Sequence, residues 1–174
     1  SHLPVAVIDT NGQEIINYKY YDMATDSMKY PEGIDVYIPM TLSIIDNENH
    51  INHPGDIPAL QSEGKLKVRG NHSAMLSKLQ YRIKLLNEKE EKNRVSILGM
   101  EPSDDWFLNG TQSDRTYLRT YLAMNFMGTL QAATPDVRFC EVLIKEGDKY
   151  LYQGIYMFLE PVSRGIGRVE IGKY

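Results

Sequence analysis

The sequence predicts an α+β domain in which a mainly antiparallel sheet carries one principal helix. Several segments alternate between apolar and polar residues, as strands with one buried face do. Another segment, residues 114–130, repeats an apolar residue at every fourth position, which is typical of a helix. With 174 residues the chain is long enough for one domain with its own core, so we expect a single domain over residues 1–174.

Two strands are expected in the first quarter of the chain. Residues 3–10 form a continuous apolar run that ends in Asn11-Gly12, a turn signal, and this pattern indicates a central strand. Residues 36–45 alternate between apolar and polar side chains and predict a second strand. Residues 46–64 are rich in turn-forming residues and are interpreted as a long loop.

Two short basic strands follow, over residues 65–69 and 81–85. In both, every second residue is apolar, and the residues between them are mostly Lys or Arg. The connection would gather cations around one loop: Arg69, Lys78, Arg82 and Lys84. Such a group suits a phosphate-bearing ligand, because ammonium and guanidinium groups supply charge-assisted hydrogen-bond donors. The alternative is a solvated sheet edge that its cations protect from other strands.

The middle of the chain holds a charged turn and the helix. Residues 87–93 are dense in charge and predict a solvated turn, and residues 95–98 begin a short strand. Asp104-Asp105 is either a turn before Trp106 or an acid/base pair. Ser113-Asp114 offers an N-cap for a helix over residues 114–130.

One face of this helix is expected to pack on the sheet. It carries Leu118, Leu122 and Phe126, which recur at helical spacing. If this face is buried, replacement of Leu122 by alanine would cost about 2–5 kcal/mol of stability.

The last third returns to β-structure. Residues 137–144 and 150–160 flank a Gly147-Asp148 tip and predict a hairpin, and residues 168–171 add a short strand. Glu160 ends an apolar strand, so its carboxylate needs a cationic partner if it is buried.

Composition limits the possible partners. The net charge of −4 gives no field that favours nucleic acid, and no apolar run reaches the roughly 18 residues that span a bilayer. The single cysteine, Cys140, excludes an internal disulfide and a cysteine-rich zinc site, and it is expected to be buried. Twelve tyrosines leave a carbohydrate-binding surface as a further possibility.

Several motifs, in this order along the chain, resemble the CotH (spore coat protein H) kinase-like family. An Arg-Gly-Asn segment is followed by a strand of the Tyr-Arg-Ile-Lys-Leu type, then by a Trp-Phe-Leu-Asn-Gly segment, a Ser-Asp-Arg helix start and a Gly-x-Tyr…Glu strand. They lie at Arg69–Ser73, Lys78–Leu85, Trp106–Gly110, Ser113–Arg119 and Gln153–Glu160. The family usually has a second lysine where this chain has Leu79, so which lysine contacts phosphate stays open.

The resemblance implies an atypical protein kinase that uses ATP and a divalent metal, Mg or Mn, to phosphorylate serines of spore-coat or cell-surface proteins. It implies an extracellular, cell-surface or spore-coat location. This chain is similar to the N-terminal lobe of such a kinase, whose partner is its own C-terminal lobe. Because the family's metal-binding aspartates follow the residues seen here, we expect no tight ATP or metal binding and no kinase activity from this chain alone.

The resemblance also selects the site residues. By motif, Arg69 and Lys78 would contact the nucleotide phosphates, Glu160 would orient such a cation, and Arg119 would contact phosphate or pack the helix on the sheet. We expect Arg69 and Lys78 to lie near Glu160 on one concave side of the sheet. The alternative is a non-catalytic spore-coat or cell-surface interaction module that keeps the fold without the chemistry.

Overall fold

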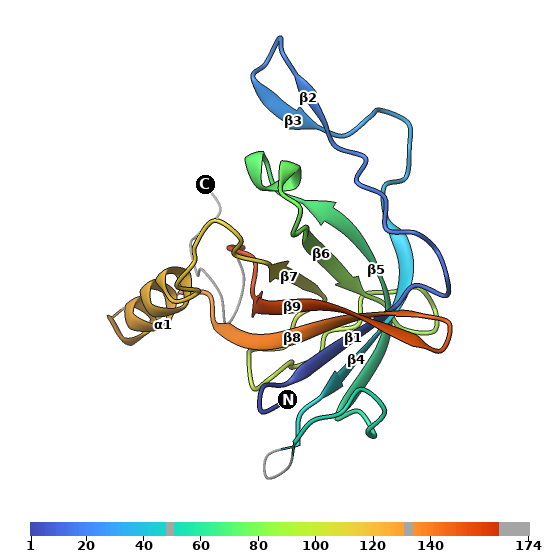
Figure 1. Cartoon of the computed structure of the whole chain (residues 1–174), viewed down its shortest axis with the longest axis vertical. Helices are drawn as coiled ribbons and strands as arrows, with labels where there is room; N and C mark the ends of the chain where they lie inside the picture. The colour runs from blue at the N-terminus through green and yellow to red at the C-terminus, as the bar shows by residue number, and fades with distance from the viewer. Residues whose placement is uncertain (48–50, 131–133, 164–174) are drawn as a thin grey trace.

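A computed structural model describes residues 1–47, 51–130 and 134–163. In this part of the chain, seven strands close a barrel in the order β1-β4-β5-β6-β7-β9-β8 (Figure 1). The barrel strands are β1 (Val5–Asp9), β4 (Ile38–Ile45), β5 (Leu60–Arg69), β6 (Gln80–Leu85), β7 (Asp105–Asn109), β8 (Val137–Glu146) and β9 (Lys149–Leu159).

The pairing is antiparallel at every seam of the barrel but one. The exception joins β1 to β8 in parallel, with Val5 opposite Glu141 and Asp9 opposite Lys145. The prediction of a mainly antiparallel sheet with one principal helix is confirmed: the described residues are mostly β with one α-helix. The closure into a barrel was not predicted, because it depends on the contact between β1 and β8, which are far apart in the sequence and leave no local pattern.

The main core fills the inside of the barrel. Alternate residues of each strand point inward, and the bulkiest fully buried side chains are Trp106, Tyr156 and Phe158. The Trp106 indole packs edge-to-face on Phe158, with ring centroids 5.6 Å apart. Cys140 is buried in the same core as a free thiol, as expected.

Two small elements lie outside the barrel. A hairpin of β2 (Tyr20–Asp22) and β3 (Ser27–Lys29) projects from one end, and a short 3-10 helix, η1 (His72–Met75), follows β5 (Figure 1). Strands of three residues are too short to show an alternating pattern, and the sequence did not predict this hairpin.

Two local predictions were wrong. The loop expected over residues 46–64 ends earlier, because β5 begins at Leu60. Residues 95–98 form no strand: Val95 makes an isolated bridge to Ser103, and Leu98 has a left-handed φ of 51° that interrupts extended pairing. Ile97 nevertheless enters the core. The strand expected over residues 168–171 lies outside the described residues.

The helix is shorter than predicted. It spans Arg119–Leu130 as α1, five residues later than the expected start. Asp114 lies five residues before the helix but still contacts its first residue, because its Oδ2 accepts the backbone N–H of Arg119 at 3.1 Å. Tyr117 has a left-handed φ of 59°, which prevents a continuous helix from Asp114.

The helix face expected to pack on the sheet is exposed instead. Leu118, Leu122 and Phe126 keep 47%, 57% and 64% of their surfaces in solvent. Side chains of the strands fill the interior of the barrel, so the helix can pack only on the outer surface of the barrel. There, Tyr121 and Met124 pack on an outer apolar cluster of buried β8 and β9 residues, Val137, Met157 and Leu159.

We therefore expect Leu122→Ala to change the free energy of unfolding by less than about 0.5 kcal/mol, the range of ordinary surface sites. Met157→Ala serves as the matched control, because Met157 is fully buried under the same helix and should cost about 2–5 kcal/mol. Urea unfolding of both variants measures the difference. Equal losses would show that the Leu122 face is covered in solution.

Candidate functional site

The outer surface of β5 and β6 is cationic. The apolar residues of these strands face the core, so their polar residues lie outside: Lys65, Lys67 and Arg69 on β5, and Arg82 and Lys84 on β6. Register places Lys67 opposite Arg82 and Lys65 opposite Lys84. Lys19, from the segment before β2, joins them. All six side chains are half-buried, and we call this surface the cationic face.

Aromatic rings lie among these cations. The Phe107 ring on β7 contacts two guanidinium groups, with Arg69 4.1 Å and Arg82 5.7 Å from its centroid. Two ammonium groups approach the Tyr30 ring, with Lys67 at 4.1 Å and Lys19 at 4.5 Å. A third ring has three lysines around it, because Lys65, Lys67 and Lys84 all approach Tyr37 within 4.8–5.4 Å.

Positive charge is in excess on this face. Arg82 is paired with Asp105, whose Oδ1 accepts its Nε–H at 2.9 Å. Arg69 donates instead to the neutral side-chain oxygen of Gln80 at 3.2 Å. Burial lowers the pKa of Lys67, and the nearby Arg82 lowers it further. A bound anion would relieve this repulsion, because it would compensate cations that water only partly reaches.

A buried apolar cluster borders the cationic face. Phe107 contacts this outer cluster beneath α1 as well as the two arginines. Its neighbour across the β7–β9 pairing is Leu159, a member of that cluster. Phe107 is half-buried, so its ring supplies a partly exposed apolar group next to the arginines.

Lys78 lies elsewhere, at one end of the barrel. Its Nζ donates to the Ile155 carbonyl at 2.6 Å and lies 4.7 Å from the ring centroid of Tyr156, a core residue. Burial lowers the pKa of this lysine. Lys78 therefore ties the start of β6 to β9, whereas Arg69 packs on the outer ring of Phe107, and the two cations do not meet at one point.

Glu160 and Arg119 have local partners. Glu160 is 4% exposed, and its Oε2 accepts the backbone N–H of Asp136 at 3.3 Å. Arg119 has an exposed side chain that forms an ion pair of 3.7 Å with Asp114. The ion pairs within the described residues do not join Glu160 to Arg69 or Lys78. That these residues contact a nucleotide stays a prediction.

Comparison with known proteins assigns the family. A family model described as CotH kinase protein matches residues 66–173. The chain belongs to the CotH kinase family. No curated protein matches the chain. Membership implies a kinase-type function with ATP, metal and a protein substrate in general terms, and the matched range includes Arg69, Arg82, Phe107 and Glu160.

Part of the cationic face of this CotH kinase family member was predictable from the sequence and part was not. Alternation over residues 65–69 and 81–85 indicated which cations face outward. Phe107 was missed, although alternation from Trp106 would have placed it on the outer face of β7. No pattern could have placed Lys19, Tyr30 and Tyr37 there, because they reach the face through irregular segments that precede the residues matched by the family model.

A metal site needs several ligands close together, and a membrane-spanning helix needs a long apolar segment. Across residues 1–47, 51–130 and 134–163, no three or more His, Cys, Asp or Glu side chains gather in a way that could hold a metal ion. No helix in the same residues is long and apolar enough to span a bilayer. We therefore assign no metal ligand to the described residues.

Proposed function

We propose that this CotH kinase domain binds ATP on the cationic face, with the phosphates held between Arg69 and Arg82. The observation that carries the proposal is the pair of guanidinium groups that both contact the Phe107 ring. Arg82 is ion-paired with Asp105, whereas Arg69 forms no ion pair with a carboxylate of the described residues. Guanidinium groups present several donors in a rigid plane, which matches the oxygens of phosphate.

The apolar neighbour of the arginines supports a nucleotide over a simple phosphate. A nucleotide joins a polyanion to a flat ring system, and the half-buried Phe107 ring offers an apolar group beside the arginines. Lys78 and Arg119, which the family resemblance also selects, are weaker candidates for direct phosphate contact. Their charged groups are engaged by the Ile155 carbonyl and by Asp114, respectively.

The finer points of the proposal rest on family membership. The domain would transfer phosphate from ATP, with Mg or Mn, to serines of spore-coat or cell-surface proteins, outside the cell or on its surface. The metal would neutralise charge on the phosphates. Glu160 is proposed to position the cationic groups of the complete nucleotide site, as a carboxylate does in ordinary kinases.

A non-catalytic interaction module is the second candidate, and one observation favours it. Helix α1 and the residue before it expose a row of large apolar side chains, Leu118, Leu122, Phe126 and Leu130. Exposed apolar rows of this kind often mark protein contacts. The same row also suits a contact with the proposed C-terminal lobe, so a nucleotide-binding test is needed to separate the two functions.

Nucleotide binding tests the proposal directly. A fluorescent ATP analogue titrated with the chain should show weak but saturable binding that unlabelled ATP reverses, since tight binding is expected to need the C-terminal lobe. Arg69→Ala should weaken that binding about tenfold or more, the usual effect of losing a hydrogen bond to a charged group. Arg94→Ala is the matched control, because Arg94 is exposed and donates to the Pro102 carbonyl away from the face.

A second variant separates lost binding from lost folding. Arg82→Ala removes the partner of Asp105 and can destabilise the strands, so its effect is interpreted with that of Arg69→Lys, which keeps the charge but loses the planar fork. Circular dichroism confirms that each variant is folded. Equal affinities for wild type, Arg69→Ala and Arg82→Ala would contradict the proposed phosphate site, and no ATP binding by the wild type would favour the interaction module.

A further inference from the structure

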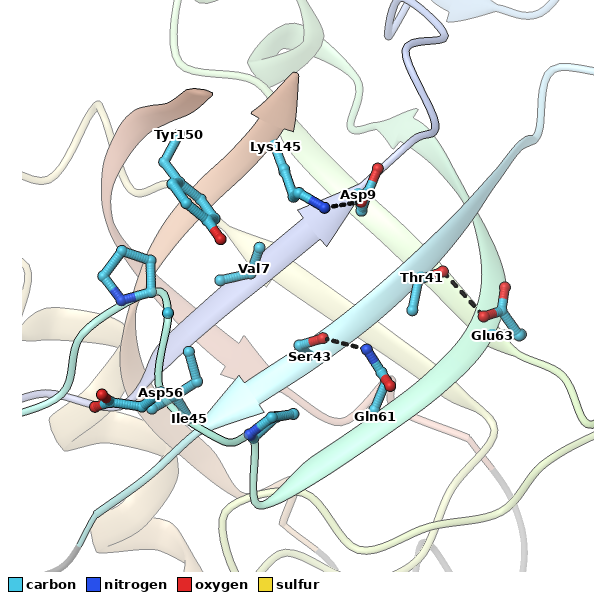
Figure 2. A pocket seen from close by; sticks show the side chains of 13 residues that line it. Val7, Asp9, Thr41, Ser43, Ile45, Asp56, Gln61, Glu63, Lys145 and Tyr150 are labelled. Carbon is cyan, nitrogen blue, oxygen red and sulfur yellow. Dashed lines mark hydrogen bonds and ion pairs between the residues drawn. The ribbon is translucent and has the colours of Figure 1, made fainter. Parts of the chain in front are cut away.

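A pocket lies on the outer surface of β1, β4 and β5, next to residues 54–58 (Figure 2). Its volume is about 400 Å³, within the range of small-molecule sites. Its floor includes Val7 and Ile45, which are 5% and 1% exposed and belong to an apolar cluster separate from the barrel core. Tyr150, 39% exposed, lines it from β9. We call it the β1–β4 groove.

The polar groups of the β1–β4 groove are held in place by one another. The Thr41 hydroxyl donates to Glu63 at 3.0 Å, and the Gln61 amide donates to Ser43 at 3.2 Å. Figure 2 shows these pairs side by side across β4 and β5. Hydroxyl, amide and carboxylate groups therefore stand in a fixed row beside an apolar floor.

The groove carries a negative excess. Lys145 pairs with Asp9 at 2.8 Å, which cancels both charges. Among the described residues that line the groove, no further cation balances Glu63 and Asp56, so its sign is the reverse of that of the cationic face. A phosphate-bearing ligand would be repelled here, whereas a neutral ligand would not.

We propose that the β1–β4 groove binds a neutral carbohydrate. A sugar ring has hydroxyls that both donate and accept hydrogen bonds, which suits the row formed by Thr41, Ser43, Gln61 and Glu63. It also has an apolar face of C–H groups, which suits the Tyr150 ring and the floor of Val7 and Ile45. Because the polar row is already held by its own hydrogen bonds, little side-chain conformational freedom is lost on binding.

Other ligand classes fit the groove less well. A peptide strand has no open edge to join, since β1, β4 and β5 are each paired on both sides in the closed barrel. A metal ion would need more acidic ligands than are gathered here, since Asp9 is already paired with Lys145. A wholly apolar ligand would remove water from the polar row, whose remaining donors and acceptors would then lack a partner.

An array of neutral and anionic oligosaccharides tests the proposal, followed by calorimetric titration with neutral hexasaccharides of glucose, xylose and N-acetylglucosamine. At least one neutral sugar should bind the wild-type chain. Tyr150→Ala should weaken its binding about tenfold, as expected when an aromatic contact is lost. Tyr152→Ala is the matched control, because Tyr152 is 59% exposed, lies on the same strand and does not line the groove.

A second variant in the groove and a competition between ATP and the sugar give two further tests. Gln61→Ala should also weaken binding, while circular dichroism stays unchanged, because Gln61 is exposed. Saturating ATP should leave the sugar affinity unchanged. The proposal is overturned if only anionic glycans or none bind, if Tyr150→Ala and Tyr152→Ala behave alike, or if ATP displaces the sugar.

Discussion

Trp106→Ala should destabilise the domain by about 3–5 kcal/mol, a loss comparable with the whole stability of many small domains. Trp106 is fully buried in the barrel and packs edge-to-face on Phe158. Its indole Nε1–H also donates to the Ser103 carbonyl at 2.9 Å. The substitution would leave a large cavity and remove one of the two donors to that carbonyl, which would keep the backbone N–H of Val95 at 3.2 Å.

Urea unfolding, followed by circular dichroism, measures the loss. Trp106→Phe is the matched control: it keeps an aromatic ring in the core but loses the hydrogen bond, so it should cost clearly less than alanine. A loss below about 1 kcal/mol for Trp106→Ala would show that the barrel interior is not packed as described.

Gly64→Ala should also destabilise the domain, with a loss of about 1–3 kcal/mol or more from overpacking. A Cβ atom at Gly64 would lie 2.4 Å from the backbone oxygen of Lys84 and 2.9 Å from the Met40 Cε. Side chains can move aside, but the β6 backbone cannot do so without disturbing its pairing with β5. The cost therefore arises from the close approach of two strands.

Gly128→Ala in α1 is the matched substitution with the opposite sign. A Cβ there meets nothing within 4 Å, and alanine in a helix is more stable than glycine by about 0.5–1 kcal/mol. Thermal unfolding of the two variants should move the midpoint down for Gly64→Ala and up for Gly128→Ala. An unchanged midpoint for Gly64→Ala would contradict the close contact between β5 and β6.

The strands were predictable where their alternation was strong. Residues 65–69, 81–85 and 137–144 all lie in strands, because a sheet with one buried face imposes a period of two. The strand predicted over residues 36–45 begins two residues later, at Ile38. Which strands pair with one another was harder to predict, since barrel closure through β1 and β8 joins distant segments of the chain. The apolar spacing of Leu118, Leu122 and Phe126 indicated a helix correctly but not what would cover its apolar face.

In the candidate site, too, local patterns predicted some features and tertiary contacts determined the others. The outward direction of Arg69 and Arg82 follows from alternation, so the cationic strands could be identified from sequence. The family motifs also selected Lys78. Its contacts with Ile155 and Tyr156 depend on where β9 lies in the barrel relative to the segment before β6, which no local pattern encodes. Phe107 became relevant only through the register that places it opposite Arg82.

The central claim is that nucleotide phosphates bind between Arg69 and Arg82, and an NMR titration with ATP and Mg²⁺ tests it most directly. The arginine side-chain Nε–Hε signals report contacts at each guanidinium, even when binding is weak. The account predicts that the signals of Arg69 and Arg82 shift saturably, while that of the exposed Arg94 stays unchanged. Saturable ATP binding that shifts neither Arg69 nor Arg82, with the largest backbone changes around Lys78 and Ile155 instead, would contradict it.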